Sequence, residues 1–427
     1  MGSVNLDNTG SGSAVTLSSD GTSLLLDGTA VGGSPDLYRD NASSATTPSA
    51  TGANAVAIGS NASAGGANSF VVGLSATDNS NQDAVVIGRF ASASANETVA
   101  IGEQSDANGL RSIALGLSAD ANGSNSISVG YNSQAYSQYS TAIGTDVQAN
   151  SDYSTAIGYG SGGSKPARTA TGAGAMALGG SYASGVDSFA AAIANNTSSY
   201  GAIGANSVAI GQTARSAQTN AVALGGNSLA NGVYSFAFGG TASGSYSVAF
   251  GGTASGTAAV NLLGGTASGE RSLAVGFRSS ATKYGQKAFA SGRFAADGDA
   301  QGSIFILRSD TTDATAEAMT TNNSTAAATN QIVAASDTCI MFSGTIVAMQ
   351  NGAQDQGGWQ INGLLKNDGG TTTLVNSEVR TFADGNGWSI VLSADDTNNA
   401  LKVQCTGEAS HNIRWVANIQ TSEVTYA

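Results

Sequence analysis

Most of the chain repeats one short pattern of large apolar, small and polar residues. Five positions alternate between large and small side chains and close on a glycine, as in Ser207-Val208-Ala209-Ile210-Gly211. Sixteen copies lie within residues 53–292, most of them 14 residues apart, with an insertion at 159–172 and an ambiguous stretch at 187–204. Because successive side chains of a β-strand point to opposite faces, the pattern predicts short strands with one large apolar face and one small face.

The glycine that closes each copy predicts a tight corner, where φ is positive or another backbone passes close by. A second alternation follows, as in Ala62 and Ala64, and then a turn rich in Asn, Gly and Asp. Two strands and two turns predict one coil of a narrow solenoid, and sixteen coils about 4.7 Å apart would form a rod roughly 75 Å long. The last copy is assigned to a corner at Gly292. The best-defined corner glycines are Gly59, Gly73, Gly88, Gly102, Gly116, Gly130, Gly144, Gly158, Gly211 and Gly225.

A coil this thin cannot bury its large apolar side chains by itself. Stacking of the coils covers the strand edges but leaves this apolar face exposed. Burying apolar surface stabilises an assembly by roughly 25 cal/mol per Å², so the chain is expected to associate with copies of itself. The side chains expected at the contact between chains include Val56, Ile58, Val99, Ile101, Ile113, Leu115, Val208, Ile210, Val222 and Leu224.

The motif at residues 206–211, with its 14-residue period, resembles the YadA-like head repeat of trimeric autotransporter adhesins. The resemblance covers about residues 53–292. It implies a left-handed parallel β-roll that forms a tight homotrimer, with the Val and Ile of each motif in the trimer core. The chain departs from the family pattern at Phe-rich copies, at Gly-Gly corners and at Asn261, where local trimer packing is expected to differ. The Phe-rich copies hold Phe236, Phe238 and Phe250, and the Gly-Gly corners are at residues 225–226, 239–240 and 264–265.

Both ends of the chain resemble parts of tailed-phage fibre proteins, in which the same head repeats occur. Residues 4–33 resemble a short module of marine phage structural proteins, and the C-terminal region is similar to modules at the ends of marine phage tail-fibre-like proteins. No signal peptide, run of 18 apolar residues or C-terminal membrane anchor is evident, which favours a phage fibre over a bacterial adhesin.

The chain is therefore expected to be all-β and to have four parts. These are an N-terminal virion-attachment module (1–33), a linker with Pro35 and Pro48 (34–52), the β-roll repeats (53–300) and a C-terminal tip (301–427). Longer strands separated by Asp/Asn-Gly turns predict that the tip is an antiparallel β-sandwich, jelly-roll-like in form. Its strands are expected at 304–307, 338–349, 358–365, 371–375, 388–392, 401–405 and 413–419.

Composition and charge narrow the class of partner. The chain has 58 Gly but only three Pro and no Gly-X-Y period, which excludes collagen. Charged residues make up 11%, and the net charge is −13. An acidic chain without a basic stripe repels phosphate backbones, so nucleic acid is excluded as a partner.

No catalytic, cofactor-binding or metal-binding set stands out. His411 is the only histidine and is expected on a surface or turn. The pairs Asp297/Asp299 and Asp395/Asp396 are interpreted as turn residues, with a glycosidase carboxylate pair as the alternative. The turn at 78–81 could hold Ca²⁺, but it lacks the twelve-residue loop pattern.

Other chemistry-bearing side chains also have a structural interpretation. Cys339 and Cys405 are expected to be free thiols, with a disulfide between them as the alternative. Tryptophans are expected in the core of the tip, although one could form a sugar-stacking platform; they are Trp359, Trp388 and Trp415. A column of tyrosines is expected to face outward and cover the rod, formed by Tyr139, Tyr153, Tyr234 and Tyr246.

The sequence thus predicts a structural and adhesive fibre on the surface of a virion, outside cells, and not an enzyme. It would be a homotrimeric tail fibre that contacts other virion proteins through its N-terminus and a host-surface glycan or protein through its tip, without inserting into membranes. Three alternatives remain open: a capsid decoration fibre, a polysaccharide-depolymerising tailspike and a bacterial surface adhesin.

Overall fold

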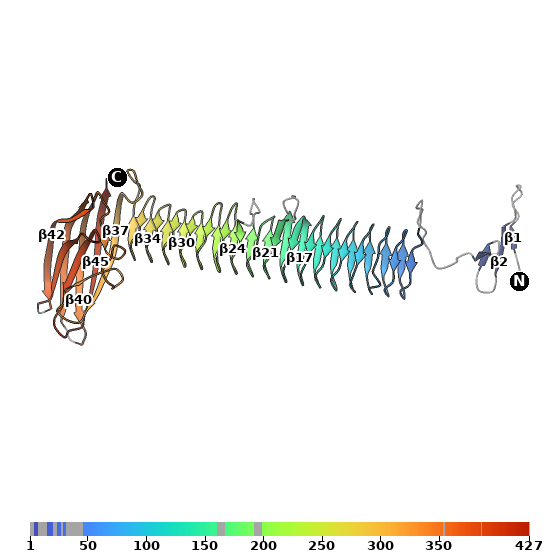
Figure 1. Cartoon of the computed structure of the whole chain (residues 1–427), viewed down its shortest axis with the longest axis horizontal. Helices are drawn as coiled ribbons and strands as arrows, with labels where there is room; N and C mark the ends of the chain where they lie inside the picture. Colours follow the sequence, from blue (N-terminus) through green and yellow to red (C-terminus); the bar gives the residue numbers. More distant parts are fainter. Residues whose placement is uncertain are drawn as a thin grey trace. The chain divides into compact units, whose positions relative to one another are not determined.

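The computed structural model describes residues 46–159, 167–191, 199–352, 355–385 and 387–426, together with four short strands near the N-terminus. These residues form strands and turns and contain no helix. The chain divides into two compact units, residues 1–166 and 167–427 (Figure 1). The predicted all-β fold is confirmed for the described residues.

The N-terminal strands form a small antiparallel sheet in the order β1 (Val4–Leu6), β2 (Val15–Ser19), β3 (Leu24–Leu26) and β4 (Thr29–Ala30). Most of the predicted linker lies outside the described residues. Its last part does not act as a linker, because β5 (Ser49–Ala50) pairs in parallel with β7 (Ser63–Ala64) of the next coil. The solenoid therefore begins before residue 53.

The first unit contains eight stacked coils, most of them with two short strands that each pair in parallel with the corresponding strand of the next coil. The first strands of the coils pair with one another, so that Val99 lies opposite Ile113 one repeat later. They are β6 (Val56–Ile58), β8 (Phe70–Val72), β9 (Val85–Ile87), β11 (Val99–Ile101), β13 (Ile113–Leu115), β15 (Ile127–Val129), β17 (Thr141–Thr145) and β19 (Thr155–Tyr159). The second strands include β7, β10 (Ser92–Ala93), β12 (Asp106–Ala107), β14 (Asp120–Ala121), β16 (Gln134–Ala135) and β18 (Val147–Ala149).

The second unit continues the same construction after β20 (Ala167–Ala170) with nine first strands (Figure 1). These are β21 (Met176–Leu178), β22 (Phe189–Ala191), β24 (Val208–Ile210), β26 (Val222–Leu224), β28 (Phe236–Phe238), β30 (Val248–Phe250), β32 (Val260–Leu262), β34 (Leu273–Val275) and β36 (Lys287–Phe289). The second strands are β23 (Gly201–Ala202), β25 (Arg215–Ser216), β27 (Leu229–Ala230), β29 (Thr241–Ala242), β31 (Thr253–Ala254), β33 (Thr266–Ala267) and β35 (Ser280–Ala281).

The structure corrects two details of the repeat. Strand β22 is a coil strand within the stretch that the sequence left ambiguous, because it pairs with β21 and β24. The last coil closes at Ala290 and not at Gly292, because Val275 lies opposite Phe289 and the Ala290 amide donates to the Val275 carbonyl. The glycine two residues later was mistaken for the corner.

Small side chains fill the interior between the two strands of a coil. Ala100 and Ala114 from the first strands and Ala107 and Ala121 from the second are fully buried. This narrow interior explains why the sequence alternates between large and small residues. Asn261 replaces alanine at one such position, and a Cβ on Gly252 would lie only 2.3 Å from its Oδ1. The glycine-rich corner therefore provides the space for the larger side chain.

The ten glycines assigned as corners all have positive φ, from 88° at Gly225 to 145° at Gly88. Stacking adds a second restriction. A Cβ on Gly88 would lie 2.1 Å from the carbonyl oxygen of Gly102, the corner of the next coil. Both the backbone conformation and the approach of the next coil thus require glycine there.

Beyond the last coil the chain forms an antiparallel β-sandwich. Its larger sheet has the order β37 (Ala300–Thr311), β45 (Ile413–Thr425), β40 (Thr338–Gln350), β41 (Gln356–Asp368) and β42 (Thr371–Asp384). The smaller sheet centres on β44 (Ala400–Thr406), which pairs with β43 (Ser389–Asp395) and with the short strands β38 (Glu317–Ala318) and β39 (Ile332–Val333). The predicted strands and the sandwich are confirmed. Strands β40, β41 and β42 form a meander, while the last strand, β45, lies between β37 and β40.

The sandwich core contains all three tryptophans. Trp359 and Trp388 pack against Trp415, with ring centroids 5.4 and 5.7 Å away, and all three are buried. The Trp415 indole donates to Thr311 Oγ1 at 2.9 Å. The prediction of core tryptophans is confirmed, and the alternative of a sugar-stacking platform is wrong because their rings are not accessible.

Candidate functional site

The large apolar side chains of the first strands lie on the outside of the coils. Of the ten residues expected at the chain-to-chain contact, Val56, Ile101 and Ile210 are exposed and the other seven are half-buried, because each points away from the alanine-filled interior. Neighbouring coils place these side chains in register, as with Val208 opposite Val222. We call this surface of the first strands the apolar face. In each unit it forms a continuous strip that the described residues leave uncovered.

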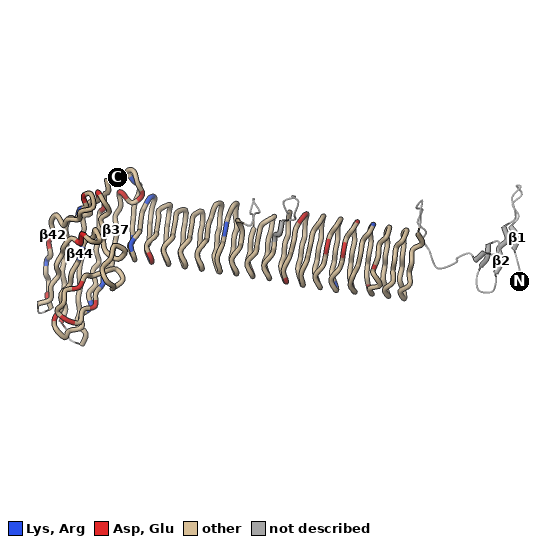
Figure 2. The backbone as a smooth tube through the Cα atoms, in the orientation of Figure 1, with Lys and Arg blue, Asp and Glu red and all other residues tan. Residues whose placement is uncertain are grey.

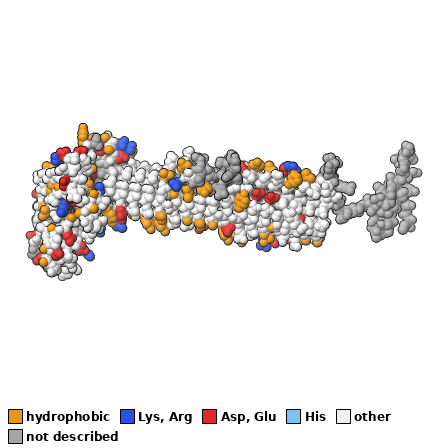
Figure 3. Space-filling model, in the orientation of Figure 1, with side chains coloured by type: hydrophobic (Ala, Val, Ile, Leu, Met, Phe, Trp, Pro, Cys, Tyr) orange, Lys and Arg blue, Asp and Glu red, His pale blue; other side chains and the backbone are white. Residues whose placement is uncertain are grey.

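The Phe-rich coils keep this apolar face and enlarge it. Phe236 and Phe238 belong to the first strand β28, and each packs against Phe250 of β30, with ring centroids 5.6 and 6.3 Å away. Phe238 is more than half exposed. In the view of Figure 3, hydrophobic side chains interrupt a surface made mostly of uncharged polar side chains and backbone.

The second strands present a polar face. Their outward positions hold residues such as Ser92, Asp106, Asp120 and Gln134, which stack in register. Gln134 Nε2 donates to Asp120 Oδ2 at 3.2 Å. Charged residues are sparse along the coils and more frequent on the sandwich (Figure 2). Each coil therefore has one face suited to water and one suited to another apolar surface.

Two stacked carboxylates on this polar face should make stability depend on pH. Burial raises the pKa of Asp106 and Asp120 above the usual 3.8, and the charge of Asp120 raises that of Asp106 further. The folded state then binds protons more readily than the unfolded state, so stability falls as pH rises through the raised pKa values and stays lower at neutral pH. We expect Asp120→Asn to raise the free energy of unfolding at pH 7 by less than about 1 kcal/mol, given solvent screening.

The measurement is thermal unfolding of both proteins between pH 7 and the carboxylate range. The difference in unfolding temperature between the Asp120→Asn variant and the unmodified protein should shrink as pH falls. Asp152→Asn removes a charge from an exposed turn of the same unit and serves as the control. A difference that grows on acidification would contradict the assigned cause.

The turn before each first strand forms a third, outward column whose residues have positive φ. Neighbours in this column contact one another from coil to coil. Asn54 donates to Asn68, Glu97 pairs with Arg111, and the rings of Tyr139 and Tyr153 stack 5.0 Å apart. Tyr234 and Tyr246 stack in the same way. The exposed tyrosines thus cover the coil edge, as the sequence predicted.

The acidic pairs considered for catalysis are engaged by nearby groups. Asp299 is buried and accepts backbone hydrogen bonds from residues 294, 295 and 296. Asp297 pairs with Arg293, with 2.7 Å between Nη1 and Oδ1. Asp395 accepts two hydrogen bonds from Asn398, and Asp396 accepts one from the Thr372 amide. These carboxylates close turns, which agrees with their structural interpretation.

The remaining polar candidates also have local roles. The buried Asp78 carboxylate accepts hydrogen bonds from the amides of Gly65, Gly66 and Ser80, so it fixes the turn considered for Ca²⁺. His411 lies in the turn before β45, with 3.1 Å between its Nδ1 and Glu408 Oε2.

The two cysteines are free and belong to different sheets of the sandwich. Cys405 lies in the core, where burial raises the pKa of its thiol to about 12. Because the thiolate is the reactive form, this cysteine is chemically inert at neutral pH. The alternative of a disulfide between Cys339 and Cys405 is not the state observed.

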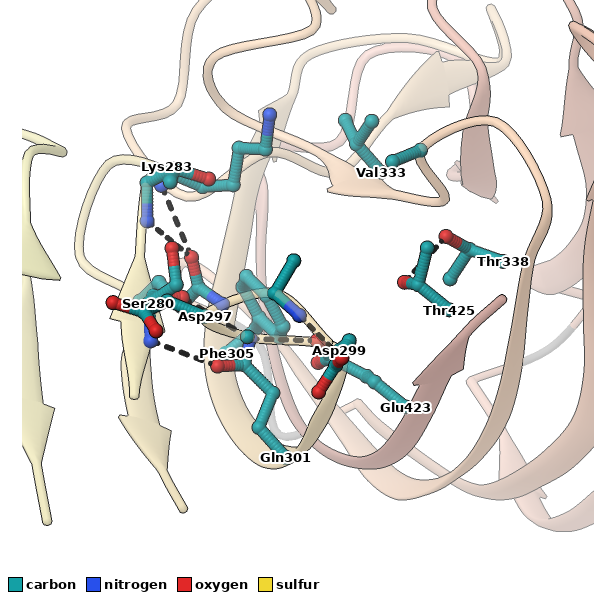
Figure 4. Close-up of a pocket in the computed structure, with 15 residues that line it drawn as sticks. Ser280, Lys283, Asp297, Asp299, Gln301, Phe305, Val333, Thr338, Glu423 and Thr425 are labelled. Carbon is teal, nitrogen blue, oxygen red and sulfur yellow. Dashed lines mark hydrogen bonds between the residues drawn. The ribbon is translucent and has the colours of Figure 1, made fainter. Parts of the chain in front are cut away.

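A pocket of about 260 Å³ opens where the last coil meets the sandwich (Figure 4). Ser280 and Lys283 come from the coil, while Thr338 and Thr425 come from the sandwich. Burial lowers the pKa of the Lys283 amine, and the charge of Glu423 acts in the opposite direction. The walls thus combine a half-buried cation, carboxylates and hydroxyl groups, which suits a polar ligand. This pocket could not be predicted from the sequence, because its lining comes from segments far apart in the chain.

Comparison with protein families identifies the repeat. A family model for the YadA head domain repeat matches segments in both compact units, so the chain carries YadA head domain repeats. The matches leave out residues 242–266, which hold Phe250, Asn261 and a Gly-Gly corner. The matched segments are 50–76, 80–105, 93–119, 107–133, 121–146, 135–161, 202–228, 218–241 and 267–295. No curated protein matches the chain.

In the part of the chain that the structure describes, no helix is long and apolar enough to cross a membrane.

Proposed function

We propose that this protein is a homotrimeric structural and adhesive fibre of a tailed-phage virion, without enzymatic activity. The observation that carries the proposal is the apolar face, which runs from coil to coil and which no other segment that the structure describes covers. Three chains that pack these faces together would bury them around one axis and leave the polar faces in water. The YadA head domain repeat supports this assembly and an extracellular surface location.

The coils serve as a spacer in this proposal. Their outward columns repeat a few residue types in register, which gives little variety for a specific binding pocket. The sandwich, by contrast, carries longer strands, more charged residues and the junction pocket with Lys283. We therefore assign binding of a host-surface glycan or protein to residues 301–427, together with the last coil. Three identical weak sites on one fibre would bind by avidity.

The virion assignment rests on the resemblance of residues 4–33 and of the C-terminal region to marine phage modules. The N-terminal sheet β1–β4 would contact other virion proteins, and the sandwich would face the host. Immunogold labelling of purified phage particles with antibodies against the sandwich tests this assignment. Label at the free ends of fibres is the expected result, and particles without label would contradict it.

Removing the sandwich should abolish host binding. A chain that ends at Asp299 keeps the coils but lacks the sandwich, which supplies most of the proposed receptor-binding region. We expect its binding to host cells, measured by flow cytometry, to fall by at least about tenfold, because the avid sites are lost. Sedimentation of the shortened chain provides the control that the coils still assemble. Equal binding by the shortened and full chains would place the receptor site on the coils.

A further inference from the structure

The sheet that carries the apolar face does not end at the last coil. Within residues 167–427, β36 pairs antiparallel with β37, and β45, β40, β41 and β42 follow in hydrogen-bonded order. Residues directly opposite each other in paired strands lie on the same face of a sheet. The apolar face of the coils therefore continues as the outer face of the larger sandwich sheet. Figure 1 shows the sandwich strands following the last coils.

One apolar column can be followed across this boundary through the strand register. Val275 lies opposite Phe289, and Phe289 lies opposite Gly302. The next strands bring a methionine into the same column, because Ser422 lies opposite Met341. In order, the column consists of Val275, Phe289, Gly302, Ser422, Met341 and Leu364.

The outer face around this column is uncharged on β37, β45 and β40. Positions near the column are apolar or neutral and polar, and include Ile304, Ile306, Asn418, Gln420, Ser343 and Thr345. The charged outer residues of these three strands lie toward the other end, where Asp310 is opposite Arg414 and Arg414 is opposite Met349. An antiparallel sheet that faces water normally alternates apolar inside with polar outside. This sheet departs from that pattern beside the coil column, where no charged residue lies on β37, β45 or β40. Toward the other end, exposed apolar residues such as Val347 and Val416 alternate with the charged ones.

The surface is also hollowed at the boundary. A depression of about 370 Å³ is lined by the apolar residues Val275, Phe289 and Ile304, and also by the polar residues Lys287 and Gln420. The Phe289 ring is more than half exposed there. The depression lies on the column itself, so whatever covers the apolar face of the coils also reaches the sandwich.

We propose that the chain-to-chain contact of the coils continues over the outer face of β37, β45 and β40. The occupant is a second copy of this chain, because the column is continuous with the face through which the coils would assemble. Met341 then lies in the contact, and Met349 lies at its open end. The inference rests on the proposed homotrimer and extends it to the sandwich.

This arrangement has a consequence for receptor binding. The junction pocket is lined by Phe305 and Thr338, which belong to the inner side of the same sheet. Contact through the outer face therefore leaves the three pockets open to a ligand. It also holds the three sandwiches in one fixed arrangement. Less conformational entropy is then lost when several sites bind one surface.

Methionine oxidation in the assembled protein tests the inference without any substitution. In the single chain the side chains of Met341 and Met349 are 52% and 63% exposed, and Met176 on the apolar face of the coils is 41% exposed. Oxidation follows exposure, so covering Met341 should slow its conversion to the sulfoxide by about tenfold relative to Met349. Hydrogen peroxide is the probe and peptide mass spectrometry the readout. In denaturant the three methionines should react at similar rates.

The expected result is slow oxidation of Met176 and Met341 and fast oxidation of Met349. Slow Met176 with equally fast Met341 and Met349 would overturn the inference and leave the proposed coil assembly intact. Fast oxidation of all three would contradict the homotrimer and the inference together. Equal protection of Met341 and Met349 would contradict the stated position of the contact.

Discussion

Replacing the ten apolar-face residues assigned from the sequence by asparagine is expected to destabilise the assembly severely. Each side chain is exposed or half-buried in the single chain. Burying its remaining exposed surface in the trimer stabilises the assembly by about 1 kcal/mol per side chain. Over three chains the substitutions remove on the order of 30 kcal/mol of gross apolar burial, before the costs of association are counted. They also place amide groups where the contact offers few hydrogen-bond partners.

The measurement for this variant is trimer dissociation by denaturant, followed by light scattering. We expect the dissociation midpoint to fall steeply and monomers to appear at micromolar concentration. A matched control places ten asparagines on the polar face of the coils and should change the midpoint little. Equal effects of the two sets would show that the apolar face is not the contact. The control positions are Ser63, Thr77, Ser92, Asp106, Asp120, Gln134, Arg215, Thr241, Thr253 and Thr266.

The substitution Gly88→Ala is expected to be among the most damaging single methyl additions in the coils. Its φ of 145° is nearly restricted to glycine and costs about 1–3 kcal/mol for other residues. The new Cβ would also lie 2.1 Å from the Gly102 carbonyl oxygen, which belongs to backbone and cannot rotate away. Strands β9 and β11 must then separate. We expect a loss of more than about 3 kcal/mol per chain, visible as faster amide hydrogen exchange in both strands.

Gly285→Asn provides the comparison for this corner. Gly285 also has positive φ, 66°, but a Cβ there would meet nothing within 4 Å. Other coils place asparagine at the equivalent turn, as at Asn206 and Asn220, and asparagine tolerates this conformation. The substitution should therefore change stability by only a few tenths of a kcal/mol. If Gly88→Ala were as mild as Gly285→Asn, the close stacking of corners would be wrong.

Much of the coil region could be predicted because its period encodes the structure directly. The alternation at residues 207–211 defines the strand and the corner, and the 14-residue spacing defines the register between coils. The prediction failed where single residues depart from the pattern. Strand β22 has Ala191 where other coils have a large apolar residue. The coils of β32 and β36 have Leu263 and Ala290 at the corner where most coils have glycine, so the corner assigned to Gly264 lies one residue earlier.

The sandwich could be predicted only in part, because its pairing is not local. The sequence located the strands, but β37 pairs with β45 across more than 100 residues, and β40 pairs with the same strand. The junction pocket and the column through Met341 depend on these pairings. Neither could be derived from patterns within one segment. Strand β42 was expected to be shorter because its second half is polar and exposed.

Sedimentation equilibrium of the full, unmodified chain tests the central claim most directly. The apolar face requires partner chains, so the account predicts a single species with three times the 41.9 kDa mass of one chain. This mass should persist on dilution through the micromolar range and change little with salt, since charged residues are sparse along the coils. A stable monomer of 41.9 kDa would contradict the account.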